Sequence, residues 1–429
     1  MRHFTKKLKA VSLAIMTISM SAQSLAEDIA ITGAKIYTMG EAGVIESGTV
    51  LISDGEIKQV LDSQRVPNGY REIDATGKVV TPGFIGALTN LGLVEVGMSA
   101  GTVDARAGAH PVSTVGAAYD VQYAINKDST IIPITRIEGF TSAITGMSGT
   151  GQLFNGQGAI IGLEPGFNST LKAKAYAHAD LNNNGADRSG GSRASLWVAL
   201  NQSLEEAGFA ANYEFSPTKA WEGWITSADA KALAPVISGE IPLLVTANRA
   251  ADILQALALK EKFANLNLVL VDATEGWRVA EQIAAANVPV ILNPEDNMPS
   301  GFDHLGATLE NAGKLHAAGV KVAIGMNTHN IRLAAQHAGN AVANGLPYEA
   351  GLASLTSNVA SIFNVDNMLG SLTPGMRADL VIWSGDPLEV TEAAEVVIIN
   401  GEEIEMTSRQ IQLRDRYLNQ DKSKPVSYR

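Results

Sequence analysis

The sequence contains no cysteine among its 429 residues. Disulfide bonds, thiolate metal sites and cysteine nucleophiles are therefore excluded. Aromatic residues make up only 6% of the chain and charged residues only 18%, whereas 46% of the residues are hydrophobic and 41 are glycine. This composition suits a compact α/β protein with a large core, and it does not suit a disordered chain.

Basic residues are also fewer than acidic ones. Lysine and arginine total 32 against 44 aspartate and glutamate residues, which gives a formal net charge of −12. Because such an acidic chain repels nucleic acid and anionic lipid, we expect neither as a partner. Long apolar runs are missing as well, since none approaches the ~20 residues that a membrane-spanning helix needs.

Residues 1–26 differ from the rest of the chain. Four basic residues near the start are followed by a short apolar segment at 10–18 and by small residues at 24–26. This is the layout of a secretory signal peptide, which predicts a mature protein that begins near Glu27 in the periplasm or outside the cell. Cleavage would change the net charge from −12 to −16, because the segment contains four basic residues and no acidic one. An uncleaved membrane anchor is the alternative.

Both ends of the mature chain show short β-type runs. One set lies within residues 29–60 and includes an Asp-Gly hairpin signal, and the other lies within residues 378–401. This pattern predicts a small β-sandwich built from both chain ends, residues 27–80 with residues 371–405. The charged tail, residues 406–429, has a helical pattern.

The middle of the chain alternates between apolar strands and helices. Continuously apolar strands are typical of a parallel sheet that is buried on both faces. The pattern predicts either a doubly wound sheet or a (β/α)8 barrel, with residues 165–225 as a long insertion of loop and helix. Earlier strands are expected within 131–134, 141–145 and 159–163. The four clearest strand and helix pairs are 241–245 with 250–263, 268–271 with 276–286, 288–292 with 303–318, and 320–324 with 331–344.

Two sequence blocks point to a known family. The first is Gly77–Ile85, and the second is Gly370–Trp383 followed by Asp386–Leu388. These blocks resemble the places where the barrel of amidohydrolase-superfamily enzymes begins and ends, in particular in imidazolonepropionase-like members. The resemblance implies a (β/α)8 barrel over residues 81–370, beside the sandwich. It also implies hydrolysis of a cyclic or non-peptide carbon–nitrogen bond in a small-molecule substrate.

The resemblance further implies one or two divalent metal ions, usually zinc, at the carboxyl ends of the barrel strands. Their ligands would be a His-x-His pair after the first strand, histidines after the fifth and sixth, and an aspartate after the eighth. In this sequence the corresponding positions are Leu88 and Asn90, Thr246, the segment 272–274, and Asn327. Leucine cannot bind a metal, and threonine and asparagine are poor zinc ligands. We therefore expect a degenerate or altered metal site and assign no metal ligand.

Other polar residues are predicted to lie at the same mouth. His329 follows the eighth strand, as an acid–base group or metal ligand, or alternatively as a histidine bonded to backbone at the start of a helix. Asp272 and Glu275 follow the sixth strand, and Glu295 and Asp296 the seventh. These acids could bind Ca²⁺ or Mg²⁺ through oxygen, or they could simply cap helices.

The residues after the fifth strand suggest a site for substrate. Arg249, beside Asn248, could hold a substrate carboxylate in a bidentate pair, or could pair with a neighbouring acid. His110 and His178 are expected in long loops and receive no role. The predicted catalytic residues are Asp272, Glu275, Asn327 and His329, and the predicted substrate-binding residues are Asn248, Arg249 and Asn330.

Two further classes of function remain open at this point. The chain could be a non-catalytic relative that binds a small molecule or a protein partner. It could also have a structural role, with the segment Trp221–Trp224 as an interaction patch, although paired tryptophans are more common in cores. A homo-oligomer is possible in each case.

Overall fold

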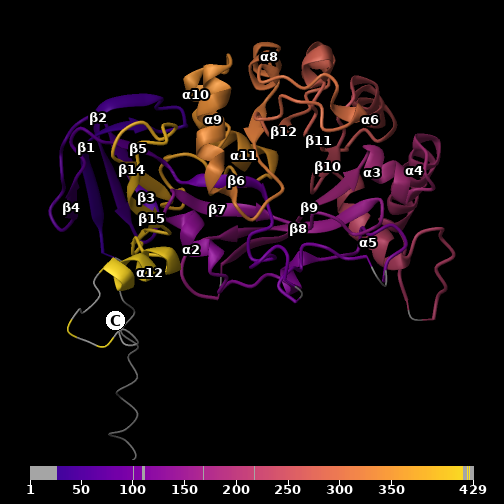
Figure 1. Ribbon diagram of the computed structural model, residues 1–429, viewed down its shortest axis with the longest axis horizontal. Coiled ribbons are helices and arrows are strands. Elements are labelled where there is room, and N and C mark those ends of the chain that lie inside the picture. Colours follow the sequence, from indigo (N-terminus) through magenta and orange to yellow (C-terminus); the bar gives the residue numbers. More distant parts are fainter. Residues whose placement is uncertain are drawn as a thin grey trace, which may run out of the picture.

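The computed structural model describes residues 27–99, 101–108, 112–167, 169–216, 218–418, 423 and 425. The predicted signal peptide, residues 1–26, lies outside these residues. The described chain forms an α/β fold with two eight-stranded sheets (Figure 1). None of its described helices is long and apolar enough to cross a membrane.

The first sheet combines strands from both ends of the chain. Its order is β16-β15-β14-β5-β1-β2-β3, with β4 beside β1. Strand β14 pairs antiparallel with β5, so that Leu380 lies opposite Pro82. Because these strands form one hydrogen-bonded sheet, the two-sheet packing of a sandwich is not confirmed. The strands are β1 (Ile29–Tyr37), β2 (Val44–Ser53), β3 (Glu56–Leu61), β4 (Arg71–Asp74), β5 (Val79–Pro82), β14 (Leu380–Trp383), β15 (Ala394–Ile399) and β16 (Glu402–Glu403).

The second sheet is a nearly closed barrel, which confirms the predicted architecture in its coarse form. Its order is β13-β12-β11-β10-β9-β8-β7-β6. The gap between the first and last strands is bridged where Thr89 pairs with Thr328. The strands are β6 (Phe84–Thr89), β7 (Phe140–Thr145), β8 (Phe154–Gly162), β9 (Thr170–Asp180), β10 (Leu243–Thr246), β11 (Leu268–Val271), β12 (Val290–Leu292) and β13 (Val322–Ile324).

The barrel departs from eight parallel β/α units at β8. This strand runs antiparallel to both β7 and β9, whereas the other neighbouring strands are parallel. An antiparallel neighbour can follow a short turn, while a parallel one needs a crossover connection. Among the residues that the structure describes between β7 and β9, no crossover helix connects the strands.

Two expectations about secondary structure are wrong. Residues 131–134 belong to helix α2 (Ile131–Arg136), whose Pro133 lies in the first turn, where proline is tolerated. The segment 165–225 is not entirely insertion, because it contains barrel strand β9. Only the second half of β9 is buried, and that half consists of alanine, tyrosine, histidine and aspartate. The β-branched residues that usually indicate a strand are missing there.

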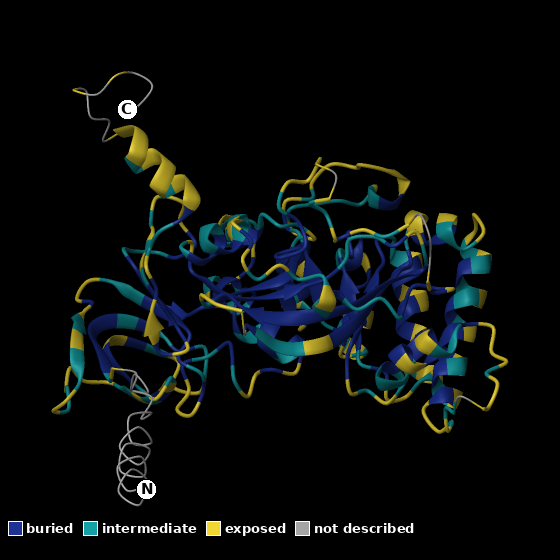
Figure 2. Cartoon of the chain, turned by 90° about the horizontal axis from the view of Figure 1, so that it is seen from below, coloured by how far each residue is buried: buried dark blue, intermediate teal, exposed yellow. Residues whose placement is uncertain are grey.

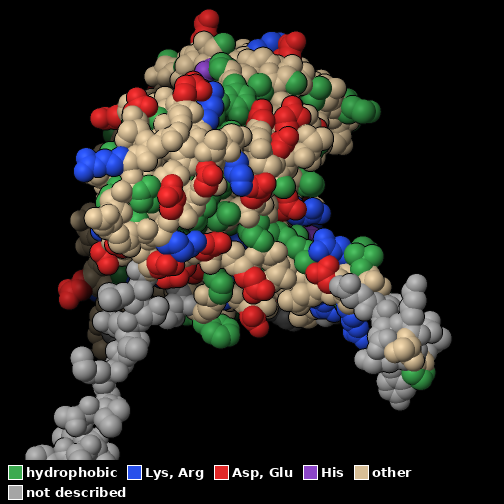
Figure 3. All heavy atoms as spheres, turned by 90° about the vertical axis from the view of Figure 1, so that its left-hand side faces the viewer, with side chains coloured by type: hydrophobic (Ala, Val, Ile, Leu, Met, Phe, Trp, Pro, Cys, Tyr) green, Lys and Arg blue, Asp and Glu red, His purple; other side chains and the backbone are tan. Residues whose placement is uncertain are grey.

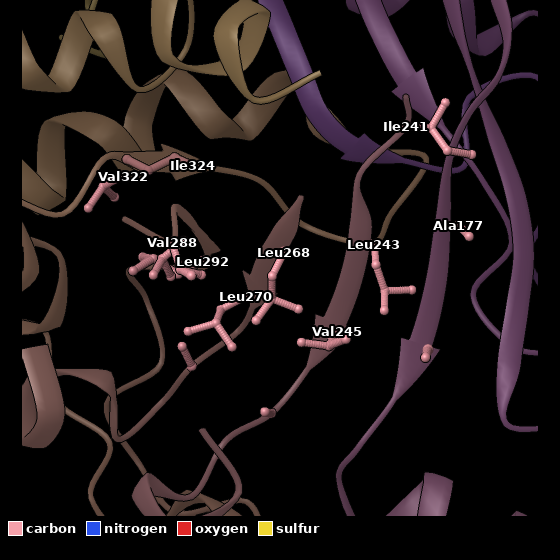
Figure 4. Close-up of a cluster of buried hydrophobic side chains, with 14 of the residues drawn as sticks. Ala177, Ile241, Leu243, Val245, Leu268, Leu270, Val288, Leu292, Val322 and Ile324 are labelled. Carbon is pink, nitrogen blue, oxygen red and sulfur yellow. The ribbon is translucent and has the colours of Figure 1, made fainter. Parts of the chain in front are cut away.

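Two layers of apolar side chains hold the barrel together. On the outer layer, side chains such as Leu243, Val245 and Leu270 join the core that the surrounding helices share (Figure 4). On the inner layer, Leu244 and Val269 fill the barrel itself. This alternation follows from the two-residue period of a strand. The longer helices beside the barrel are α3 (Asn183–Arg188), α4 (Arg193–Ala210), α5 (Ser227–Ile237), α6 (Ala250–Lys262), α7 (Ala280–Ala285), α8 (Asn311–Ala317), α9 (Ala334–Ala343), α10 (Tyr348–Ala353) and α11 (Ser357–Ile362).

The surface carries mixed charge. Helix α12 (Arg409–Leu418), in the predicted tail, buries none of its residues and extends from the body of the protein (Figure 2). At the end formed by β1, β2 and β4, acidic and basic side chains are interspersed with scattered apolar ones (Figure 3).

Candidate active site at the barrel mouth

The interior of the barrel changes from apolar to polar at the carboxyl ends of its strands. Active sites of (β/α)8 barrels lie at this end, because the loops that follow the strands meet there. The aliphatic layer that includes Leu88 and Leu244 is succeeded by buried polar side chains. These polar residues include Asn90, His178, Asp180, Thr246 and Asn248.

Two asparagines bond to each other across the closure of the barrel. Nδ2 of Asn90 donates to Oδ1 of Asn327 at 2.8 Å and to the carbonyl oxygen of Gly146 at 2.7 Å. The backbone N–H of Asn90 donates to the carbonyl oxygen of Thr328 at 3.0 Å. Asn90 thus connects the loops that follow β6, β7 and β13. Both asparagines occupy positions where the family resemblance implies metal ligands.

The donor set at these positions does not fit a zinc ion. Leu88 is only 3% exposed and packs in the barrel core. Thr246 Oγ1 lies 2.8 Å from Nε2 of His178, so these two groups are hydrogen-bonded partners. In the part of the chain that the structure describes, no group of three or more His, Asp or Glu side chains could hold a metal ion. A zinc centre needs three or four such ligands.

His178 corrects a prediction from the sequence. It lies in strand β9 and is buried at the mouth, not in a long loop. Its Nε2 is also 3.9 Å from Oδ1 of Asp180. Burial lowers the pKa of His178 below its ordinary value, although the nearby Asp180 opposes this. Sequence reasoning missed both residues because it did not recognise their strand. His110 lies outside the described residues.

Asp272 has the properties of a functional carboxylate. It follows β11, and both Asp272 and Ala273 adopt left-handed backbone angles, with φ of 65° and 45°. Such angles are costly for residues other than glycine and are often found at functional sites. Its backbone N–H donates to Ile291, but within the described chain its carboxylate has no hydrogen bond or ion pair. Burial, together with the charges of Asp296 and Asp180, raises its pKa to about 7.

The carboxylate of Glu275 is occupied by structural contacts. Its Oε2 accepts from the backbone N–H of Ala250 at 2.9 Å, at the first residue of α6. The same oxygen accepts from Nη1 of Arg278 at 2.9 Å. This is the helix-capping arrangement that was the alternative to a catalytic role. A catalytic role for Glu275 stays an untested prediction.

The predicted substrate-binding residues after β10 are also engaged within the protein. Arg249 forms a bidentate pair with Asp252, with nitrogen–oxygen distances of 2.8 and 2.7 Å. Asn248 is buried, and its Oδ1 accepts from Oγ1 of Thr274 at 3.0 Å. Arg249 thus has the neighbouring acid that was the alternative to a substrate clamp. Substrate binding by either residue remains a prediction.

The loop after β13 brings three predicted site residues together. Asn327, His329 and Asn330 lie within four residues of one another. Oδ1 of Asn330 accepts from Nε of Arg332 at 2.9 Å. His329 is partly buried, and in the described chain its imidazole has no hydrogen bond or ion pair. His329 and Asp272 are therefore the two predicted catalytic residues whose side chains are free to meet a ligand.

The two acids after β12, Glu295 and Asp296, form hydrogen bonds within the protein and do not form a cation site with other described residues. Oδ1 of Asp296 accepts from Nδ2 of Asn293 at 3.3 Å, and Oε1 of Glu295 accepts from Nδ2 of Asn340 at 2.8 Å. Burial raises the pKa of Asp296 above its ordinary value. The described acids at the mouth do not form a cluster suited to Ca²⁺ or Mg²⁺.

We expect the hydrogen bonds of Asn90 to stabilise the folded protein measurably. Asn90→Ala leaves the buried carbonyl oxygen of Gly146 and the amide of Asn327 without their donor. We expect the free energy of unfolding to fall by about 1–3 kcal/mol in urea titrations. Asn367→Ala, at an exposed position, serves as the control and should change it by less than about 0.5 kcal/mol. Equal stability of the two variants would show that the Asn90 contacts do not hold the barrel closed.

Comparison with known proteins supports the resemblance found in the sequence. Residues 248–407 match the model of the amidohydrolase family. The amidohydrolase tasK of Hapsidospora irregularis is 44% identical over 57 residues, which is 13% of this chain and 6% of that protein. The dihydroorotase of Listeria monocytogenes serovar 1/2a (strain ATCC BAA-679 / EGD-e) is 47% identical over 47 residues, 11% of each chain. The matches to these two curated relatives thus span about a tenth of their length or less.

The fold is shared over a much longer stretch. An amidohydrolase from Thermotoga maritima MSB8 superposes with a TM-score of 0.77, covering 89% of this chain and 100% of that one. Its sequence identity is 24%, so this likeness bears on the fold and not on the reaction. Residues 248–407 of this chain therefore match the amidohydrolase family, and the described chain shares the fold of an amidohydrolase.

Proposed function

We propose that this protein is an exported hydrolase that cleaves a cyclic or non-peptide carbon–nitrogen bond in a small molecule without the usual zinc centre. The observation that carries the proposal is the free carboxylate of Asp272 at the barrel mouth, whose pKa is raised to about 7. A strongly perturbed acid in this position is typical of catalytic sites. The short matches to an amidohydrolase and a dihydroorotase support the reaction class.

The chemistry needs one group that both accepts and returns a proton. The Asp272 carboxylate takes a proton from a water molecule while the water oxygen attacks the substrate carbonyl carbon. The attack opens the carbonyl double bond to an oxyanion. As the oxyanion re-forms the C=O bond, the carbon–nitrogen bond breaks, and the protonated Asp272 returns the proton to the departing nitrogen. A pKa near the working pH suits both steps, because neither protonation state is then rare.

A chelator experiment tests the proposed reaction. The mature chain, residues 27–429, is incubated with hydantoins, cyclic imides, N-acyl amino acids and aryl ureas, with and without EDTA. We expect turnover of at least one class at the same rate under both conditions. Turnover that stops in EDTA and returns with added zinc would contradict the proposal.

A second candidate is binding without turnover. The observation that favours it is that several polar groups at the mouth bond to each other, as in the pairs Asn90–Asn327 and His178–Thr246. Because these groups already have partners, few charged groups at the barrel mouth remain free to bind a ligand. If a compound of the same panel raises the melting temperature but yields no product, binding is the function. The ligand would then stabilise the folded state by mass action alone.

Export is the remaining part of the proposal and rests on residues 1–26. Their basic start, apolar middle and small residues before Glu27 form the signal-peptide pattern. We expect the native protein in the periplasmic or extracellular fraction, with Glu27 as its first residue by mass spectrometry. A full-length chain in the cytoplasmic fraction would contradict this part.

A further inference from the structure

A groove of about 690 Å³ lies beside helix α4, next to the barrel mouth. Its walls are largely apolar. They come from α4, the end of α3, residues 114–115 and 152–153, and Trp224 before α5. Two of its hydrophobic side chains are unusually exposed for their size, Val198 at 70% and Trp224 at 52%. Pockets with an apolar wall and a few polar groups are typical of small-molecule sites.

One cation lines this groove, the guanidinium of Arg188. Its Nη1 lies 2.7 Å from Oδ2 of Asp180, and its side chain is 23% exposed. Gly149 lies close to Nη2, since a Cβ added there would be 3.4 Å from this nitrogen. Arg188 is therefore anchored by one carboxylate, and its side chain stays partly exposed at the groove.

Other arginines of this chain show that a guanidinium here readily takes two carboxylates. Arg193 pairs with Asp252 and Asp303. Arg71 and Arg377 each pair with two acids as well. Arg188 pairs with one acid among the described residues and borders the groove, so it has room for a second carboxylate.

A second polar group in the groove has no partner. Ser189, next to Arg188, lines the same groove, and its buried Oγ makes no hydrogen bond within the described chain. A buried hydroxyl without a partner is costly and is often explained by a ligand or a water molecule. Ser189 and Arg188 thus each bring a hydrogen-bond donor to the lining of this groove.

We propose that this groove binds a small organic acid with an apolar body. The carboxylate is held by Arg188 and Ser189, and the apolar body lies against Val198 and Trp224. Hydrogen bonds between a guanidinium and a carboxylate are stronger than neutral ones, which favours the acid over its uncharged analogues. The proposal concerns binding and does not depend on hydrolysis at Asp272.

Matched probes test the proposal by calorimetry. 4-Phenylbutanoate and 4-phenylbutanamide share the apolar body and differ in charge, so their affinities report on Arg188. We expect the acid to bind the mature protein at least about tenfold more tightly than the amide, which corresponds to about 1.4 kcal/mol. Equal affinities, or no binding of the acid, would overturn the proposal.

Three variants separate the charged contact from the apolar one. Arg188→Gln should abolish the preference for the acid, and Val198→Asp should weaken both probes. Val390→Asp is the matched control, because Val390 is similarly exposed at 68% and lies outside the groove. If Arg188→Gln fails to fold, Ser189→Ala replaces it and should weaken binding of the acid only. A preference that survives the Arg188 or the Ser189 change would overturn the assignment.

Discussion

Asp272→Asn is expected to remove hydrolysis, lowering kcat by about 10²–10⁴-fold. Asparagine keeps the size of the side chain but cannot accept the proton of the attacking water. The structure gives this carboxylate no structural partner within the described chain, so the loss is expected to reflect chemistry and not misfolding. The rate with a substrate identified in the chelator experiment is the measurement. Asp366→Asn, at an exposed position, is the control and should keep the wild-type rate.

The same variant is expected to be more stable than the wild type at high pH. Because the folded-state pKa of Asp272 is raised to about 7 from 3.8, the folded protein binds more protons than the unfolded chain between these values. The wild type therefore loses stability as the pH rises from about 4 to about 7, on the order of 2–4 kcal/mol. Asp272→Asn removes this loss, so its gain should be present at pH 8 and small at pH 4.

Urea unfolding of both proteins at the two pH values measures the effect. A gain that is equal at pH 4 and pH 8 would show that Asp272 has an ordinary pKa. A loss of stability at pH 8 would show instead that the carboxylate is held by favourable contacts. Either outcome would remove the basis for its role as a proton acceptor.

Arg193→Ala is expected to lower the free energy of unfolding by about 3–5 kcal/mol. Arg193, at the start of α4, donates to Asp252 on α6 and to Asp303 in the loop after β12, each at 3.0 Å. The side chains of both aspartates are 5% exposed. Without the guanidinium, and among the described residues, Asp303 keeps one backbone donor, from Asn183, and Asp252 keeps its pair with Arg249. The cost is large because the buried carboxylate of Asp303 would lose its arginine partner.

Urea titration again measures this effect, with Arg65→Ala as the control on an exposed loop. The control should differ from the wild type by less than about 0.5 kcal/mol. If Arg193→Ala also changes the free energy of unfolding by less than about 0.5 kcal/mol, the ion pairs of Arg193 with Asp252 and Asp303 stabilise the protein no more than an exposed salt bridge does.

The sequence predicted those parts of the fold that have a strong local signal. Strands β10 to β13 are continuous apolar runs, and each was expected from that pattern alone. Strand β9 was missed because its buried half, which ends in His178 and Asp180, looks polar. The sequence predicts a strand where helix α2 lies, because the segment begins with two isoleucines. In β9 and α2, tertiary packing outweighs the local secondary-structure propensity of the residues.

The residues of the candidate site also differ in whether they have a local sequence signal. Asp272 could be predicted because it directly follows a recognisable strand. The bond from Ala250 to Glu275 and the pair of Asn90 with Asn327 could not, because they join residues that are distant in sequence. Arg188 was missed along with β9, since its importance depends on Asp180 at the end of that strand. The one sequence signal for Arg188 is that Asp180, an acid that could pair with it, lies eight residues earlier in the segment 165–225.

The metal content of the purified mature protein is the most direct test, because the proposed hydrolase has an amidohydrolase-like barrel and works without the usual zinc centre. The protein, produced without affinity tags that bind metals, is dialysed against metal-free buffer and analysed by plasma mass spectrometry. The account predicts zinc far below one equivalent per chain, both before and after incubation with zinc and a second dialysis. One or more equivalents retained through dialysis would contradict it.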